Sequence, residues 1–335
     1  MLKRKSLIST REWEIEDIEL LISLAKDIKK WRYAGNVPKF LKDRSLFMLY
    51  CNEAIRARIC VGAAVDILGG RVHFINLPTL DEERIVDIAR ICGKAGSAIV
   101  MELSEEAIKH PYGFGNSVVR RCAERIDVPV LNLGDEKFNP VQAISDMLTI
   151  KEKLGDDVRG KKCVITWIYS DEVRSRGAVQ DDILIATRYA MDVILAFPPG
   201  FELDEDLMLK AKESADEYGG SFKVERDFKQ ALIGAQVLIL RSWASKECVK
   251  LGLNKFGGDR EVEVRDKYID WLLTPDLMDL ADRNVVVIHD LPISRGKGAT
   301  MAIINGPLSV ALDQVENSVY VSAAALALLT ADRQV

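Results

Sequence analysis

Short apolar runs alternate with longer stretches of helical periodicity along the whole chain. The apolar runs, predicted as strands, cover residues 45–50, 72–75, 97–101, 128–132, 162–167, 192–197, 221–224, 235–240 and 284–288. The periodic stretches, predicted as helices, cover residues 16–32, 55–68, 81–94, 115–125, 140–153, 178–190, 204–218, 227–233, 275–281 and 318–330. Such alternation favours parallel sheets with helices on both faces. The sequence therefore predicts an α/β fold with doubly wound parallel sheets.

The length of 335 residues allows two domains. A charged stretch, residues 151–162, separates two halves that each repeat the alternation. We therefore predict an N-terminal α/β domain over residues 1–150 and a second α/β domain that begins at residue 151.

Composition argues against several classes of protein. A net charge of −5 gives no support for nucleic-acid binding. No apolar stretch reaches the length of a membrane span, and a charged helix, not an apolar segment, follows the basic residues at the start. The six cysteines form no C-x-x-C pair, which favours reduced core cysteines in a cytoplasmic protein. The three histidines share no metal-ligand spacing, so we expect neither a metal nor another cofactor.

The turn over residues 52–58 joins a predicted strand to a predicted helix. Asn52 opens it, and Arg56 and Arg58 lie at the helix N-terminus. Backbone N–H groups and the helix dipole favour an anion there, so the two arginines predict a phosphate or carboxylate site. The turn has no Ser or Thr hydroxyl and no string of glycines.

Ligands of open α/β sheets bind outside the carboxyl ends of the strands, which selects further side chains in the first half. Glu102 ends one strand, although most such glutamates are merely exposed. Asn139 and Gln142 open a helix, and their amides could bond a carbonyl. The alternative is that Asn139 before a proline is an ordinary N-cap.

The same rule selects two strand ends in the second half. His289 and Asp290 could orient an amine or shuttle its proton, or Asp290 could simply cap a turn. Arg241, Ser242 and Trp243 could hold an acidic group against an aromatic wall, although such a tryptophan more often lies at a domain interface. Arg295 and Lys297 follow the His-Asp pair and add to a polar site.

Taken together, these motifs resemble the aspartate/ornithine carbamoyltransferase family over almost the whole chain. The turn with Arg56 and Arg58, followed by Leu68-Gly-Gly, resembles the family's S-T-R-T-R and LGG. Asn139-Pro-Val-Gln resembles H-P-x-Q, and His289-Asp-Leu-Pro resembles H-C-L-P. The residues 313–317 and 324–329 resemble the family's closing motif.

The second half is most similar to the knotted N-acetylornithine and N-succinylornithine carbamoyltransferases. Arg241-Ser-Trp resembles their K-S-W, and residues 295–307 have the length of their threaded loop. The resemblance implies a trefoil-type knot in the second domain, residues 151–317, and a C-terminal helix, residues 318–335, that returns to the N-terminal domain. It also implies a homotrimer with active sites between subunits.

Departures from the family gather at the carbamoyl phosphate positions. The hydroxyl residues of the turn are replaced by Ala54, Ile55 and Ala57, and Glu102 stands where the family has an arginine. Asn139 replaces a histidine. Removing one oxyanion donor costs about 10²–10³ in rate, so the resemblance implies a rebuilt donor pocket.

We therefore predict an enzyme of this family that acts on an ornithine-like or other amino-acid-derived substrate, and whose donor or reaction has diverged from ordinary carbamoyl phosphate transfer. Arg56, Asn139, Gln142, His289 and Asp290 form its predicted catalytic group. The predicted substrate-binding residues are Asn52, Arg58, Glu102, Arg241, Ser242, Trp243, Arg295 and Lys297. The expected partners are an amino-acid-like substrate, an anionic co-substrate or group, and two further copies of the chain, with neither nucleic acid nor membrane. The alternatives are a non-catalytic ligand-binding homologue and a plain N-acetylornithine-type carbamoyltransferase.

Overall fold

A computed structural model describes residues 5–293 and 296–330. Within them the chain divides into two compact units. Unit 1 consists of residues 5–108, 112–145 and 315–330, and unit 2 of residues 109–111 and 146–314. Each unit is built around one parallel sheet, which confirms the predicted fold class.

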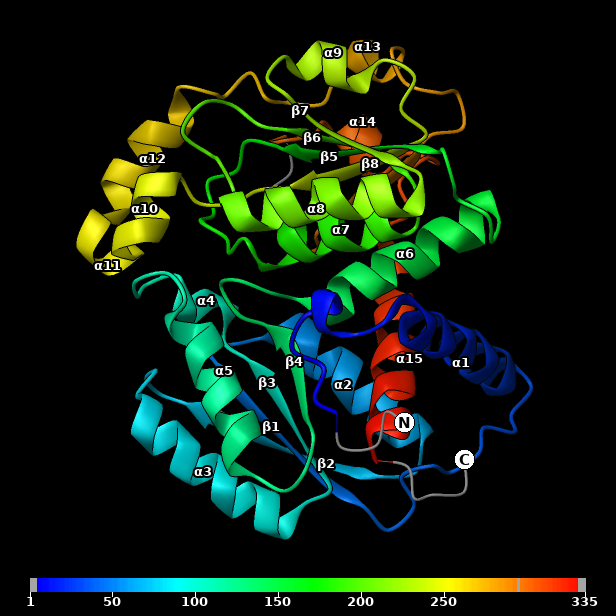
Figure 1. The fold of residues 1–335 in the computed structure, drawn as a ribbon, viewed down its shortest axis with the longest axis vertical. Helices are drawn as coiled ribbons and strands as arrows, with labels where there is room; N and C mark the ends of the chain where they lie inside the picture. Colours follow the sequence, from blue (N-terminus) through cyan, green and yellow to red (C-terminus); the bar gives the residue numbers. More distant parts are fainter. Residues whose placement is uncertain (1–4, 294–295, 331–335) are drawn as a thin grey trace. The chain divides into compact units, whose positions relative to one another are not determined.

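Unit 1 has a four-stranded sheet in the order β2-β1-β3-β4, and every pairing is parallel. Its strands are β1 (Ser45–Cys51), β2 (Arg71–Leu77), β3 (Ala98–Glu102) and β4 (Val130–Gly134). Its helices are α1 (Ile15–Tyr33), α2 (Ile55–Ile67), α3 (Glu82–Ala95), α4 (Ser104–Ala107) and α5 (Phe114–Arg125), after a short η1 (Thr10–Glu12). Figure 1 shows α3 and α5 on one face of this sheet and α2, α15 and α1 on the other.

Two helices pass between the units in sequence. Helix α6 (Pro140–Leu154) begins in unit 1 and continues into unit 2. Helix α15 (Ala311–Thr330) begins in unit 2 and continues into unit 1. In unit 1, Lys29 Nζ of α1 donates to Asn317 of α15 at 2.8 Å. Near the end of α15, the Thr330 carbonyl accepts from Arg44 at 2.6 Å.

Unit 2 has a five-stranded parallel sheet in the order β7-β6-β5-β8-β9. Its strands are β5 (Lys162–Trp167), β6 (Asp192–Ala196), β7 (Ser221–Glu225), β8 (Val237–Arg241) and β9 (Val286–His289). Its helices are α7 (Gly177–Arg188), α8 (Glu205–Tyr218), α9 (Phe228–Leu232), α10 (Lys246–Leu251), α11 (Leu253–Phe256), α12 (Gly258–Asp266), α13 (Pro275–Met278) and α14 (Met301–Ile304). In Figure 1, α7 and α8 lie side by side on one face of this sheet.

The segment after β8 differs from the prediction. No helix was predicted between residues 240 and 275, and the structure has the three short helices α10, α11 and α12 there. Ser245 caps α10 by accepting from the Cys248 N–H at 3.3 Å. In α12 the polar residues Glu261 and Arg265 are the buried ones, so the helix carries no apolar periodicity. Helix α15 begins at Ala311, earlier than the predicted residue 318. Its first turns bury the polar residues Gln314 and Asn317, so they lack the apolar pattern on which the prediction depended.

Candidate functional site

The turn after β1 holds two residues in the left-handed region of backbone space. Asn52 has φ 56° and Ala54, the N-cap of α2, has φ 43°. Residues other than glycine adopt this region at a cost of about 1–3 kcal/mol, and such strain gathers at functional sites. Ala54 makes no side-chain capping bond to α2. The predicted strand-to-helix turn is therefore present, and its backbone is strained.

The two arginines of the turn have different surroundings. Arg58 packs its guanidinium over the rings of Tyr50 and Phe74, at 5.1 Å and 5.5 Å from the ring centres. Its Nη1 donates to the Glu53 carbonyl at 3.4 Å. Arg56 lies where its charge lowers the pKa of the Glu102 carboxyl. The positive charge of Arg56 therefore acts on the Glu102 carboxyl, whereas Arg58 stacks on two aromatic rings.

Glu102 ends β3, and its carboxyl is only partly exposed. Oε1 accepts a hydrogen bond from the Ser104 N–H at 3.1 Å and another from the Ser104 hydroxyl. Burial raises the pKa of Glu102 to about 7, against the opposing effects of the Ser104 bonds and the Arg56 charge. Near neutral pH, Glu102 therefore exists both as a neutral acid and as an anion.

Asn139 immediately precedes α6 and acts as its cap. Its Oδ1 accepts the Gln142 N–H at 3.1 Å. This is the capping bond of an ordinary N-cap, the alternative considered for Asn139. A Cβ on Gly134 would lie 2.9 Å from Glu102 Oε2 and 3.2 Å from Asn139 Nδ2. The side chains of Glu102 and Asn139 therefore both approach the bare backbone of Gly134 at the end of β4. Gln142 is buried, with 5% of its surface exposed.

A second acid of unit 1 escaped the sequence prediction. Glu136 is 3% exposed, and its Oε1 accepts from the Asn116 N–H at the start of α5 at 3.3 Å. Burial and the neighbouring Asp135 carboxylate raise the pKa of Glu136 to about 7. Glu136 lies close against Gly115, where a Cβ would come within 2.3 Å of Oε2. Only the absence of a side chain at residue 115 admits this carboxyl.

Unit 2 contains a buried arginine that three aspartates share. Arg241, at the end of β8, donates from Nε to Asp182 at 2.9 Å and from Nη1 to Asp290 at 2.6 Å, and it also donates to Asp146. These come from α7, the loop after β9, and α6 respectively. The surrounding carboxylates raise the pKa of Arg241 further above its ordinary value.

Three carboxylates around one cation leave an excess of negative charge in a buried place. Burial raises the pKa of Asp182 to about 6, despite the attraction of Arg241. The negative charge of Asp290 acts in the same direction as burial. Arg241 was predicted to hold an acidic group of a substrate. In the structure Arg241 is 2% exposed, and its guanidinium forms ion pairs with the three aspartates.

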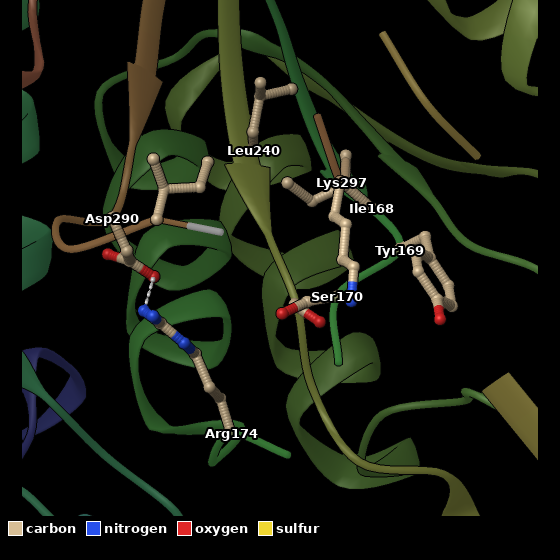
Figure 2. Close-up of a pocket in the computed structure, with 9 residues that line it drawn as sticks. Ile168, Tyr169, Ser170, Arg174, Leu240, Asp290 and Lys297 are labelled. Carbon is tan, nitrogen blue, oxygen red and sulfur yellow. Dashed lines mark ion pairs between the residues drawn. The ribbon is translucent and has the colours of Figure 1, made fainter. Parts of the chain in front are cut away.

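A pocket opens beside this cluster, within unit 2. Its lining residues are Ile168, Tyr169, Ser170, Arg174, Leu240, Ser242, Asp290, Ile293 and Lys297. Figure 2 shows Arg174 and Asp290 pointing toward one another, with 3.6 Å between Nη1 and Oδ2. Lys297 Nζ donates to Asp171 at 2.7 Å. Cationic, anionic and apolar groups in one pocket suit a ligand with the charges of an amino acid.

Three of the predicted residues of unit 2 line this pocket, whereas His289 does not. Ser242, Asp290 and Lys297 belong to the lining. His289 is 2% exposed, with Nε2 3.0 Å from the Ser309 hydroxyl, and burial lowers its pKa. The imidazole is therefore held neutral beside Ser309.

Trp243 has the environment of a core residue. Its side chain is fully buried, and its indole N–H donates to the Phe201 carbonyl at 2.8 Å. Its ring packs edge-on against Phe197. Because the indole is buried in the core, it does not form the predicted aromatic wall of a ligand site. Arg295 lies outside the described residues.

Arg174 is the pocket residue that sequence reasoning missed. It donates to Glu172 at 2.6 Å and to the Pro292 carbonyl at 2.8 Å, and it faces Asp290. The rule on strand ends selects the loop after β5, where Arg174 lies. That loop contains several charged residues, and nothing in the sequence distinguishes Arg174 among them.

Neither a metal site nor a membrane span emerges from the part of the chain that the structure describes. Across residues 5–293 and 296–330, no three His, Cys, Asp or Glu side chains gather in a way that could hold a metal ion. No helix in these ranges combines the length and the apolar character needed to cross a bilayer. All six cysteines are buried and free, as predicted for core cysteines.

Comparison with known families defines the class of protein. Residues 5–152 match the carbamoyl-P binding domain of aspartate/ornithine carbamoyltransferase, and residues 161–329 match the Asp/Orn binding domain. The chain belongs to the aspartate/ornithine carbamoyltransferase family, which confirms the resemblance.

Individual relatives are similar over nearly their whole length. The N-acetylornithine carbamoyltransferase of Xanthomonas campestris pv. campestris is 29% identical over 97% of this chain and 97% of its own. The ornithine carbamoyltransferase of Pyrococcus abyssi is 30% identical over 98% of this chain and 96% of its own.

Solved structures are also similar over nearly the whole chain. The ornithine carbamoyltransferase from Pyrococcus furiosus superposes with a TM-score of 0.84 at 28% identity, over 98% of each chain. An acetylornithine transcarbamylase in complex with acetylcitrulline superposes with a TM-score of 0.84 at 27% identity, over 97% of this chain and 99% of its own.

Proposed function

We propose that this chain is a transferase of the carbamoyltransferase type that acts on an ornithine-like or other amino-acid-derived substrate, with a donor pocket altered so that ordinary carbamoyl phosphate is not its donor. One observation carries the proposal. The carboxyl of Glu102 lies beside Asn139 at the ends of β3 and β4, within the field of Arg56. When ionised, this carboxyl repels a phosphate and partly neutralises the arginine that would attract it.

The strained turn after β1 supports the same proposal. A phosphate needs donors, and the side chains at positions 54, 55 and 57 are Ala, Ile and Ala. Ile55 is 57% exposed, so an apolar side chain occupies the N-terminus of α2, where an anion would bind. Arg56 and Arg58 can still bind an anionic group weaker than a phosphate dianion. Asn52, Asn139 and Gln142 supply amides for a carbonyl.

The pocket of unit 2 supports the amino-acid side of the proposal. Arg174 and Lys297 offer positive charge for a carboxylate, and Ser242 offers a hydroxyl. Asp290 offers negative charge for an ammonium group, although both of its oxygens face arginines. His289 keeps its predicted role toward an amine as part of the proposal. The trefoil-type knot over residues 295–307 and the cytoplasmic location also stay predictions.

We also propose that the working form is a homotrimer. Ile55 and Ile59, one helical turn apart on α2, are 57% and 62% exposed. Phe74 of β2 is 38% exposed and packs under the guanidinium of Arg58. We call these three exposed apolar residues of unit 1 the α2–β2 patch. Exposed apolar side chains on neighbouring elements favour burial against a second copy of the chain.

A second candidate function is that of a plain N-acetylornithine-type carbamoyltransferase. The observation that favours it is the similarity, over 97% of both chains, to an enzyme of that name. In that case the neutral form of Glu102 would replace a cationic donor. The two candidates differ in whether carbamoyl phosphate is turned over.

A colorimetric assay for citrulline-type products separates the candidates. Carbamoyl phosphate is supplied with ornithine, with N-acetylornithine, or with other amines. We expect no colour at ordinary enzyme concentration, together with thermal stabilisation of the protein by its amino-acid substrate. The variant Glu102→Arg should not restore transfer, because the turn hydroxyls are also missing. Colour at the rates of ordinary enzymes, in the wild type or in this single variant, would overturn the altered donor pocket. Silence without any stabilising amino acid would indicate a homologue that does not use such substrates.

A further inference from the structure

Two aspartates share one face of the Arg241 guanidinium. Nε donates to Oδ2 of Asp182 at 2.9 Å, and Nη2 donates to Oδ2 of Asp146. These two N–H groups point in parallel, and such a pair usually binds both oxygens of a single carboxylate. The carboxyls of Asp146 and Asp182 therefore lie side by side, with one oxygen of each in the place of a single carboxylate.

Both carboxyls are shielded from water. The side chain of Asp146 is 2% exposed and that of Asp182 is 0% exposed. Oδ1 of Asp182 is buried, and it has no hydrogen-bond partner among residues 5–293 and 296–330. Two ionised carboxyls offer each other acceptors only. One bound proton supplies the missing donor, and it allows a side-chain hydrogen bond between Asp182 and Asp146.

The charges within unit 2 favour binding of that proton. The three carboxylates of Asp146, Asp182 and Asp290 surround Arg241. A second cation, Arg174, lies 3.6 Å from Asp290. Three carboxylates therefore face two guanidinium groups, and one bound proton makes the cluster neutral.

Two neighbouring titratable groups carry no balancing charge. Burial lowers the pKa of His289, so its imidazole stays neutral. Burial and the charges of Asp182 and Asp146 raise the pKa of Cys163 on β5, so its thiol keeps its own proton. Burial raises the pKa of Asp182 itself to about 6, against the attraction of Arg241. The balancing proton therefore belongs to the aspartate pair and leaves it near neutral pH.

Asp290 is the carboxylate of the cluster that can respond to loss of this proton. Its side chain is 16% exposed, more than those of the other two aspartates, and it lines the pocket. Oδ1 accepts from Arg241 at 2.6 Å, and Oδ2 faces Arg174, as Figure 2 shows. An added negative charge beside Arg241 repels Asp290, which has a second cation within reach.

We infer that Asp146 and Asp182 share one proton on a face of Arg241, and that this proton is a switch for Asp290. While it is bound, Arg241 holds the Asp290 carboxylate at the end of β8. When it leaves to solvent, Asp290 turns from Arg241 toward Arg174 in the pocket. The inference rests on the proposed function only in taking this pocket as a ligand site.

The proton is detected by infrared spectroscopy of the protein without ligand at pH 5 and pH 8. A ¹³C label in the aspartate carboxyls separates their bands from those of Glu102 and Glu136. With a pKa of about 6, the pair is about nine-tenths protonated at pH 5 and about one-hundredth protonated at pH 8. We therefore expect one protonated aspartate carboxyl in each chain at pH 5 that is lost by pH 8.

Matched variants assign this carboxyl. Asp182→Asn should lack it, and so should Asp146→Asn, because the pair holds a single proton. Either variant suffices should the other not fold. Asp135, whose pKa burial also raises, contributes equally to the wild type and the variants. The control is Asp157→Asn, which should keep the signal, because Arg159 lowers the pKa of Asp157 and holds it ionised.

The position of Asp290 is read from ligand-free crystal structures at the same two pH values. We expect the Arg241–Asp290 hydrogen bond at pH 5 in the wild type and its loss at pH 8. Asp182→Asn should keep the bond at both, because an amide donates to Asp146 and cannot lose its proton in this range. An equal band in the wild type and both variants would refute the shared proton. An unmoved Asp290 in the wild type would refute the switch. Neither readout involves a ligand or turnover, so each result is independent of the proposed function.

Discussion

Arg241 donates from Nη1 to Oδ1 of Asp290 across 2.6 Å, and this bond ties the loop after β9 to the end of β8. The same guanidinium also holds Asp146 of α6 and Asp182 of α7. Arg174 approaches the other oxygen of Asp290 from the pocket side, at 3.6 Å. The position of the Asp290 carboxylate in the pocket is therefore set by a buried cation that no ligand needs to touch.

Replacing Arg241 by Met should destabilise the protein severely. The change removes the cation from Asp146 and Asp182, which are almost fully buried, and leaves Asp290 with Arg174 alone. We expect the free energy of unfolding to fall by about 3–5 kcal/mol, measured by urea denaturation. The control is Arg159→Met, which breaks an exposed pair with Asp157 and should change stability by less than about 1 kcal/mol. Equal stability of the two variants would contradict a structural role for the cluster.

Replacing Glu136 by Gln should change how stability depends on pH. The pKa of Glu136 in the folded chain is about 7, above its ordinary 4.5. Between these values the folded state holds a proton that the unfolded chain has lost, so this group's contribution to stability falls as pH rises. From pH 5 to pH 8 the wild type should lose up to about 3 kcal/mol relative to Glu136→Gln.

The measurement for Glu136 is denaturation at both pH values. Glu102 and Asp182, whose pKa values are also raised, titrate in both proteins and largely cancel in the difference. Burial also raises the pKa of Asp135, which lies beside Glu136, so the difference reports this pair of carboxyls together. The exposed Glu217→Gln serves as the control and should follow the wild type. Parallel stability curves for the wild type and Glu136→Gln would show that Glu136 titrates as an ordinary acid.

Replacing Gly134 by Ala should weaken ligand binding more than it weakens the fold. The added Cβ would come within 2.9 Å of Glu102 Oε2, the end of a flexible side chain, which must move away. We expect a loss of about 1–3 kcal/mol of stability and at least about a tenfold loss of affinity for acetylcitrulline, measured by calorimetry. Gly93→Ala is the control, because its Cβ would meet Ile126 at an ordinary 3.4 Å. Unchanged affinity in Gly134→Ala would separate Glu102 and Asn139 from the donor pocket.

Replacing Ile59 by Asp should prevent assembly if the α2–β2 patch is an interface. We expect the wild type to sediment at three times 37.4 kDa and Ile59→Asp to sediment as a monomer, because a carboxylate in a buried apolar interface is costly. Ile91→Asp is the control, since Ile91 is 71% exposed on α3 and lies outside the patch. The proposed homotrimer is refuted by a monomeric wild type, and the role of the patch by a trimeric Ile59→Asp.

The fold was predictable where the signal is local and apolar. Every strand of the two sheets was predicted, and the inner strands β1, β3, β5 and β8 are apolar because parallel strands inside a sheet are buried on both faces. The edge strands β2 and β7 are mostly exposed. The helices α10 to α12 were not predicted, because their buried side chains include the charged residues Glu261 and Arg265. These two form an ion pair, and Glu261 also accepts the Ser245 N–H. A buried polar network has no hydrophobic period for the sequence to display.

The candidate site was predictable only in part, for a related reason. The turn at residues 52–58 is contiguous, so a strand end and a helix start identify it. The Arg241 cluster joins Asp146, Asp182 and Asp290, which lie far apart along the chain. Spacing cannot reveal such a set. Arg241 and Trp243 were therefore assigned to ligands when their neighbours within unit 2 already engage them.

The passage of α15 from unit 2 back to unit 1 has a consequence for synthesis on the ribosome. Almost all of unit 2 is one continuous stretch, residues 146–314, and is complete once that stretch has emerged. Unit 1 starts earlier but lacks the partners of Lys29 and Arg44 until residues 317 and 330 have been made. We expect a nascent chain of which residue 314, but not yet residues 317 and 330, has emerged to be protected from protease in its later part and cleaved in its earlier part. The segment translated first would then be the last to reach its native state.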